Sequence, residues 1–177
     1  NLLNQCFAVV TACYHAAQHL KTNYDYNNVH YLQPSVDTIA CYAANRASVN
    51  RVIDLYYMGR RIENRHAKFM QWSQQSGVFY FYDTAGNVPM IDHQQHRRRY
   101  LDILNRTKLF VVSPGKIINP DAKQLPEEIG YRYFEAAACG AIMIGDLPNS
   151  PVFKNTFNYR DAVIPIPADN DLSCFLD

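Results

Sequence analysis

The sequence predicts an α/β fold, a mostly parallel sheet with helices on both of its faces. Short apolar runs of strand length alternate with longer segments of helical periodicity through most of the chain. The strand runs are also almost continuously apolar, as over 52–58 and 78–82. Such runs are typical of parallel strands that are covered by helices on both sides.

The composition fits one globular domain and excludes several classes of protein. The 177 residues carry 17 basic and 16 acidic side chains, a formal net charge of +1, so no overall field attracts nucleic acid or an anionic membrane. No run reaches the roughly 18 apolar residues of a membrane span, and the first residues lack the basic-then-apolar order of a signal peptide. The five cysteines contain no C-x-x-C pair, so we expect reduced thiols, no zinc site and a cytoplasmic protein.

The first 50 residues predict one β-α unit followed by a connector. The apolar run 6–11 suits a buried strand, and the spacing of apolar residues over 14–24 predicts a helix. A short strand is expected over 29–32, and Pro34 marks the bend at which the chain leaves it.

Regular β-α alternation begins at Arg51. Strands are expected at 52–58, 78–82, 109–112, 141–144 and 162–167, and helices at about 63–76, 93–106 and 149–157, with a further helix that carries Glu135 and ends at Gly140. The prolines of the last strand predict that it lies at an edge of the sheet. Because open parallel sheets bind ligands at the carboxyl ends of their strands, we expect the site in the loops after Met58, Val112 and Ile144.

The first of these loops predicts an anion site. Arg60 and Arg65 flank the start of a helix, where both guanidinium groups and the helix dipole favour a bound anion. The alternative is that these arginines are solvated surface charges. His66 follows them, as a possible aid at a phosphate or as a polar surface residue.

The segment 126–140 holds two carboxylates eight residues apart, Glu127 and Glu135, with Gly130 between them. A helix start beside a glycine presents N–H groups to an anion, while carboxylates bind hydroxyl groups. The alternative is a plain helix start in which Glu128 and Arg132 form a supporting i,i+4 ion pair.

Two other motifs predict structure rather than chemistry. Asp92, His93 and His96 lack a fourth ligand at a known spacing, so the polar start of a helix is a better interpretation than a metal site. The basic run 97–99 is interpreted as a solvated helix face, and Cys139 in an alanine run as a small buried side chain.

Taken together, the motifs resemble those of retaining GT-B glycosyltransferases. The segment 126–140 is similar to the Glu-x7-Glu signature of the donor-binding domain, and Gly59 and Arg60 with Arg65 are similar to its glycine-arginine loop. The run 31–37 resembles the connector between the two domains of that fold. The form of 132–135 is closest to the spore-protein-like members. The resemblance implies a Rossmann-like C-terminal half of a GT-B fold.

The resemblance also implies a site for a nucleotide-diphosphate sugar. Glu135 would bind the ribose hydroxyls, and Glu127, or Glu128 if the loop is shifted by one residue, would face the sugar. Arg60 and Arg65 would neutralise the diphosphate leaving group. Gly59 and the backbone of Gly130, Tyr131 and Arg132 would complete the donor site, and no metal or other cofactor is required.

In domain terms, residues 1–28 would be the end of an acceptor domain, 29–50 the connector, and 51–177 the donor-binding domain. The expected function is a hexosyltransferase that retains configuration, with the nucleotide sugar and an unknown saccharide, lipid or protein acceptor as partners. We expect the chain to be a fragment that binds donor but does not transfer sugar without an acceptor domain. The alternative is a non-catalytic module that keeps the fold. The sequence names neither base, sugar nor acceptor.

Overall fold

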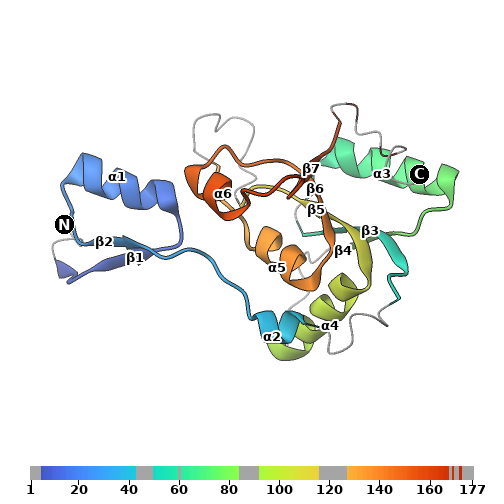
Figure 1. Ribbon diagram of the computed structural model, residues 1–177, viewed down its shortest axis with the longest axis horizontal. Coiled ribbons are helices and arrows are strands. Elements are labelled where there is room, and N and C mark those ends of the chain that lie inside the picture. Colours follow the sequence, from blue (N-terminus) through green and yellow to red (C-terminus); the bar gives the residue numbers. More distant parts are fainter. Residues whose placement is uncertain are drawn as a thin grey trace.

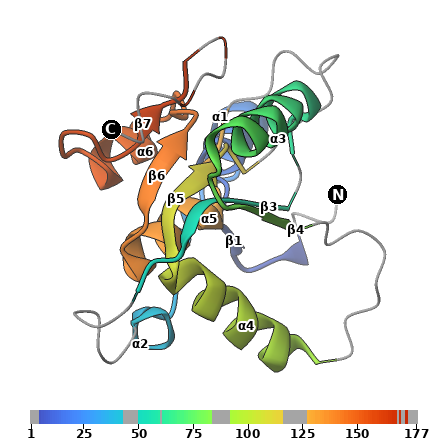
Figure 2. The ribbon, with the colours of Figure 1, turned by 90° about the vertical axis from the view of Figure 1, so that its right-hand side faces the viewer.

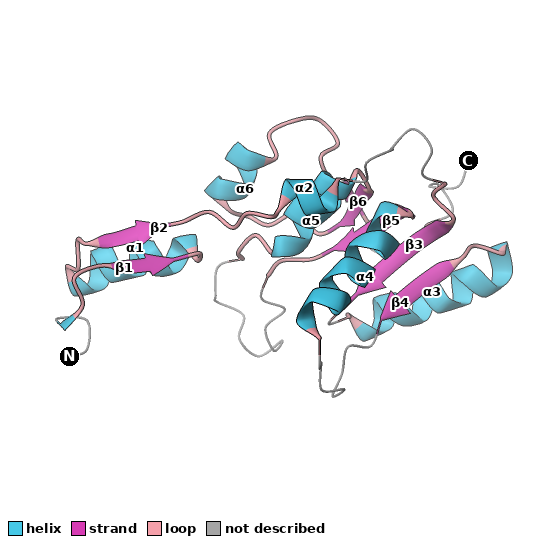
Figure 3. Ribbon diagram, turned by 90° about the horizontal axis from the view of Figure 1, so that it is seen from below, coloured by secondary structure: helices cyan, strands magenta, loops and turns pink. Residues whose placement is uncertain are grey.

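The computed structural model describes residues 5–42, 50–59, 61–83, 92–115, 127–167, 169 and 172. Its first part is a small N-terminal unit that consists of β1 (Val9–Thr11), α1 (Tyr14–Tyr24) and β2 (Val29–Tyr31). β1 and β2 pair in parallel. Figures 1 and 3 show this unit at one end of the molecule, joined to the larger part by an extended connector.

The larger part is built on a five-stranded sheet in which every neighbouring pair of strands is parallel. Its order is β4-β3-β5-β6-β7. The strands are β3 (Ile53–Met58), β4 (Tyr80–Asp83), β5 (Thr107–Val112), β6 (Ile142–Gly145) and β7 (Ile164–Pro165). The predicted parallel α/β sheet is confirmed, with β7 at the expected edge.

Helices cover both faces of this sheet, as Figure 2 shows for α3 and α4. The helices of the larger part are α2 (Thr38–Cys41), α3 (Glu63–Ser76), α4 (His93–Asn105), α5 (Tyr131–Cys139) and α6 (Pro151–Thr156). On one face, Phe69 of α3 packs with Leu55 and Tyr57 of β3. On the other, side chains of α2, α4, α5 and α6 form a second core against the same strands. The apolar runs are therefore buried on both sides, as their composition required.

Helix boundaries follow local signals in the sequence. α3 spans the expected residues and ends at Gly77, whose φ of +69° is the left-handed conformation that glycine adopts at low cost. α4 starts after Asp92, whose side chain accepts hydrogen bonds from the N–H groups of Gln94 and Gln95. Asp92 is thus a helix cap, as its interpretation as a polar helix start predicted.

Several element boundaries differ from the expected ones, and two of the differences have a local physical reason. The helix α2 lies in the connector and was not predicted. It is a single turn whose N-cap is Asp37, and the Asp37 side chain accepts a hydrogen bond from the N–H of Ala40. β5 starts at Thr107, two residues earlier than expected, because the Thr107 hydroxyl bonds to the carbonyl of Ile103 and allows this polar side chain to be buried.

The strand order creates a switch point between β3 and β5. From β3 the chain moves to β4 on one side, and then returns to place β5 on the other side. Loops that leave the carboxyl ends of β3 and β5 therefore diverge to opposite faces of the sheet. Ligands of open parallel sheets bind in the crevice that such a divergence leaves.

Gly145, at the end of β6, packs closely against β5. Its φ is +148°, and a Cβ there would overlap the carbonyl oxygen of Val112 on β5. Gly77 also has a positive φ, but a Cβ would meet nothing within 4 Å. We expect Gly77→Ala to lower the free energy of unfolding by about 1–2 kcal/mol. Gly145→Ala should cost about 3 kcal/mol or more, since overlap adds to backbone strain.

Urea unfolding followed by circular dichroism measures both losses. Gly77→Ala is the control for the backbone strain alone. Equal losses for the two variants would show that the contact of Gly145 with β5 does not limit the packing of the sheet.

Candidate functional site

A cleft of about 890 Å³ lies at the switch point. Its walls come from the carboxyl ends of β3 and β5, the start of α5, one side of α4, the connector and the end of β1. The lining residues are Thr11–Cys13, Pro34–Asp37, Tyr57–Gly59, His96, Arg97, Tyr100, Val111, Ser113–Gly115, Glu128–Arg132 and Glu135. The N-terminal unit therefore forms part of the same cleft as the sheet.

Two glycines let the loops of this cleft approach each other. The N–H of Gly115 donates to the carbonyl of Glu128 over 2.9 Å. A Cβ on Gly130 would come within 3.3 Å of the Cα of Gly115, closer than most real side chains allow. The loop after β5 is thus packed directly on the start of α5.

Gly130 is also the N-cap of α5, and no side chain in the described part of the chain caps this helix. The first N–H groups of a helix have no partner within it, and together with the helix dipole they favour an anion. Gly130, Tyr131 and Arg132 line the cleft. The start of α5, with the positive end of its dipole, therefore lies in the cleft wall.

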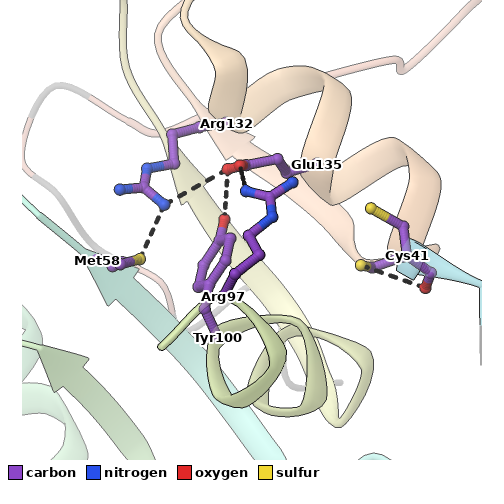
Figure 4. A network of polar contacts seen from close by, with 7 residues as sticks. Cys41, Met58, Arg97, Tyr100, Arg132 and Glu135 are labelled. Carbon is purple, nitrogen blue, oxygen red and sulfur yellow. Dashed lines mark hydrogen bonds and ion pairs between the residues drawn. The ribbon is translucent and has the colours of Figure 1, made fainter. Parts of the chain in front are cut away.

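Glu135, on the second turn of α5, is the centre of a polar network (Figure 4). Its carboxylate is 5% exposed and accepts hydrogen bonds from the Arg97 guanidinium and, over 2.6 Å, from the Tyr100 hydroxyl. Arg132 reaches the same carboxylate at 3.4 Å. With two arginines around one carboxylate, the network carries a formal charge of +1.

The network is fixed by further contacts of its members. The Arg132 guanidinium lies 5.0 Å above the Tyr100 ring and donates to Sδ of Met58 at the end of β3. A Cβ on Gly59, whose φ is +84°, would lie 3.4 Å from Nη2 of Arg132. Burial raises the pKa of Tyr100, and the Glu135 charge adds to the rise, so its hydroxyl stays a donor over the physiological range.

Arg65 takes a different place from the one expected. Its guanidinium donates to both carboxylate oxygens of Asp146, after β6, over 2.9 and 3.0 Å. Its side chain is 11% exposed, and it is not among the residues that line the cleft. The other expected diphosphate ligand, Arg60, lies outside the described residues.

The two adjacent carboxylates have opposite surroundings. Glu127 is exposed and accepts from the N–H of Asn149 over 3.0 Å. Glu128 is buried and accepts from the N-terminal unit, at the start of α1. The alternative of a supporting ion pair between Glu128 and Arg132 is wrong: α5 begins at Tyr131, so Glu128 precedes the helix and is not one helical turn from Arg132.

The sequence interpretation missed Arg97. This arginine, expected on a solvated face, lies beside Glu135 because α4 packs against α5. A signal was present: Arg97 stands three residues before Tyr100 and four before Leu101, both buried, so it borders the apolar face of the helix. Cys139 is buried, as predicted.

His66 belongs to an aromatic cluster rather than to the cleft. Nδ1 of His66 lies 2.8 Å from the Tyr80 hydroxyl, and its ring packs edge-on against Tyr82 at a centroid distance of 4.7 Å. Within the described ranges, no three His, Cys, Asp or Glu side chains gather in a way that could hold a metal ion. Among the same residues, no helix is both long and apolar enough to cross a membrane.

A parallel sheet with a cleft at its switch point, beside the start of a helix, is the arrangement of a Rossmann-like α/β domain. Comparison with known families agrees: residues 46–173, more than two thirds of the chain, match the family described as glycosyl transferase-like. The chain belongs to this family and is a glycosyltransferase domain of the GT-B type, with a Rossmann-like α/β fold. No curated protein and no solved structure gives a significant match.

Tyr100→Phe tests the Glu135 network. The change keeps the buried ring and removes only the hydroxyl that donates to the carboxylate. Because hydrogen bonds to charged groups contribute about 1.5–3 kcal/mol, we expect the free energy of unfolding to fall by about that amount. Tyr159→Phe, at a half-exposed ring, is the control and should change it by less than about 0.5 kcal/mol. Chemical unfolding measures both, and equal effects would contradict the assigned bond.

His66 gives a pH-dependent test. Burial lowers its pKa below the usual 6.5, the Arg61 charge lowers it further, and Glu63 opposes them. The neutral imidazole is therefore favoured in the folded state. Its contribution to stability is present above pH 6.5 and is lost as the pH falls through the folded pKa. An NMR titration should give a midpoint below 6.5, which Arg61→Gln raises and Glu63→Gln lowers. A midpoint at or above 6.5 would contradict the assigned surroundings.

Proposed function

We propose that this domain binds a nucleotide-diphosphate sugar in the cleft and takes part in transfer of the sugar to an acceptor. The observation that carries the proposal is the position of Glu135. A buried carboxylate lies in the wall of a cleft at the switch point, between two arginines and next to an uncapped helix start. Such a wall offers a carboxylate that accepts hydrogen bonds from hydroxyl groups, next to a site for an anion.

The contacts of Glu135 support its role as the ribose ligand. Arg97 and Tyr100 hold the carboxylate in one orientation, and a charged acceptor binds sugar hydroxyls more strongly than a neutral one. The Ser113 hydroxyl, just after β5, is buried in the same cleft and has no hydrogen-bond partner among the residues that the structure describes. It is available to a polar group of the ligand.

For the diphosphate we propose Arg132, the first N–H groups of α5 and Arg60. Arg132 lines the cleft, and its guanidinium lies next to Gly59, where the loop after β3 begins. Arg65 would have to leave Asp146 to reach a phosphate. We therefore propose that Arg65 supports the loop after β3 through its ion pair with Asp146. Preorganised positive charge at the diphosphate stabilises a leaving group without a metal.

Glu127 remains the proposed sugar ligand, because its carboxylate is exposed. Retention of configuration and a hexose as the transferred sugar follow from the resemblance to retaining enzymes. A cytoplasmic location rests on the cysteine pattern. The acceptor is proposed to approach from the N-terminal unit, since Thr11–Cys13 also line the cleft.

Calorimetric titration with UDP, GDP and their sugars tests the proposal. We expect saturable binding of one nucleotide, unchanged by a chelator. Glu135→Gln and Arg132→Met should each weaken it about 10- to 100-fold, as loss of a charged hydrogen bond does. Arg160→Ala is the control, because that side chain is 94% exposed and pairs with its neighbour Asp161.

Wild-type protein that binds none of these nucleotides would overturn the proposal. Equal affinity of the Glu135 variant and the wild type would remove Glu135 from the site. Binding without release of nucleoside diphosphate from the sugar donor, in the presence of candidate acceptors, would favour the non-catalytic module.

A further inference from the structure

Glu128 joins the two parts of the molecule. Its carboxylate accepts from the N–H of His15 over 2.8 Å, from the N–H of Tyr14 over 3.2 Å and from Sγ of Cys13 over 3.0 Å. These donors lie in the N-terminal unit, 113–115 residues away in the chain. The side chain of Glu128 is buried by the contact.

This contact supplies a cap that α1 lacks. The N-cap position of α1 is Cys13, which makes no side-chain cap, and the first turn contains no acidic residue. Serine, threonine, aspartate and asparagine are the side chains that normally satisfy these N–H groups. Glu128 satisfies two of them from another part of the fold, and its charge interacts favourably with the helix dipole.

The same loop also forms the cleft. The carbonyl of Glu128 accepts from the N–H of Gly115, and two residues later Gly130 starts α5. From the N-terminal unit, Cys13 and the two residues before it line the same cleft. Glu128 therefore spans the cleft from its sheet side to its N-terminal side. Burial and the Glu128 charge together raise the pKa of Tyr31, the last residue of β2, as expected for a carboxylate held against this unit.

We propose that Glu128 is a positioning residue that holds the N-terminal unit against the donor domain and so sets the width of the cleft. The role as a sugar ligand, considered for it from the sequence, is replaced by this one. The proposal rests on the proposed function only in naming the cleft as the donor site.

Amide hydrogen exchange by NMR tests the contact in the protein without ligand. In Glu128→Ala the amides of Tyr14 and His15 should exchange about tenfold faster or more, because each loses a charged acceptor. Glu127→Gln changes the neighbouring carboxylate, which bonds to Asn149 instead, and should leave both amides unchanged. Amides of β3 and β5 in the same samples report whether the fold is intact, and Glu128→Gln is the second variant if the alanine variant unfolds.

A second measurement separates holding the unit from merely capping α1. Small-angle X-ray scattering should give a larger radius of gyration for Glu128→Ala than for wild type or Glu127→Gln. Adding Cys13→Asp to Glu128→Ala provides α1 with a cap of its own. Exchange of the α1 amides should then slow again, while the radius of gyration stays raised.

An unchanged exchange rate would overturn the contact, and an unchanged radius of gyration would overturn its role in holding the unit. Recovery of the wild-type radius by Cys13→Asp would also overturn that role, because it would show that only the helix cap matters. Neither measurement needs a nucleotide. Failure of the nucleotide titration would therefore leave this proposal standing, and failure here would leave the donor site standing.

Discussion

The buried carboxylate of Glu135 constrains the structure around the cleft. Removing a carboxylate from water costs several kcal/mol unless partners with good geometry compensate for it. Those partners come from α4, through Arg97 and Tyr100, and from Arg132 on its own helix. The helices α4 and α5 must therefore stay packed together where Glu135 lies. Their packing also fixes the side of the cleft on which Tyr100 lies, so a stabilising contact and the shape of the site have one origin.

The strand order places this network where a ligand can reach it. β3 and β5 are neighbours in the sheet although β4 and two helices separate them in the chain, so the loops at their carboxyl ends diverge. Glycines then allow close approach. The backbone of Gly115 packs on that of Gly130, and the backbone of Gly59 packs on the Arg132 guanidinium. A larger side chain at these positions would fill the cleft or push its walls apart. The cleft thus follows from topology and close approach together.

Local pattern predicted the elements well but not the contacts between them. The apolar spacing over α3 and the glycine that ends it determine this helix within one segment, as the apolar run of β3 determines a buried strand. Arg97 and Glu135 are 38 residues apart, and nothing in either segment indicates that they meet. The contact depends on how α4 and α5 pack on the sheet. The short α2 was missed for another reason, because a single turn started by Asp37 has no periodicity to detect.

Glu127 and Glu128 show why a motif alone does not assign a site. They are neighbours in sequence, and either satisfies the spacing of a carboxylate pair around Gly130 within one residue. In the loop before α5 the two side chains have different partners, the N–H of Asn149 for Glu127 and the start of α1 for Glu128. One carboxylate is left exposed while the other is buried against the start of α1. Glu128 is compensated there by a helix dipole and Glu135 by two arginines, so neither adds uncompensated negative charge to the cleft. The network around Glu135 keeps its formal charge of +1, and of the two adjacent carboxylates only that of Glu127 stays exposed.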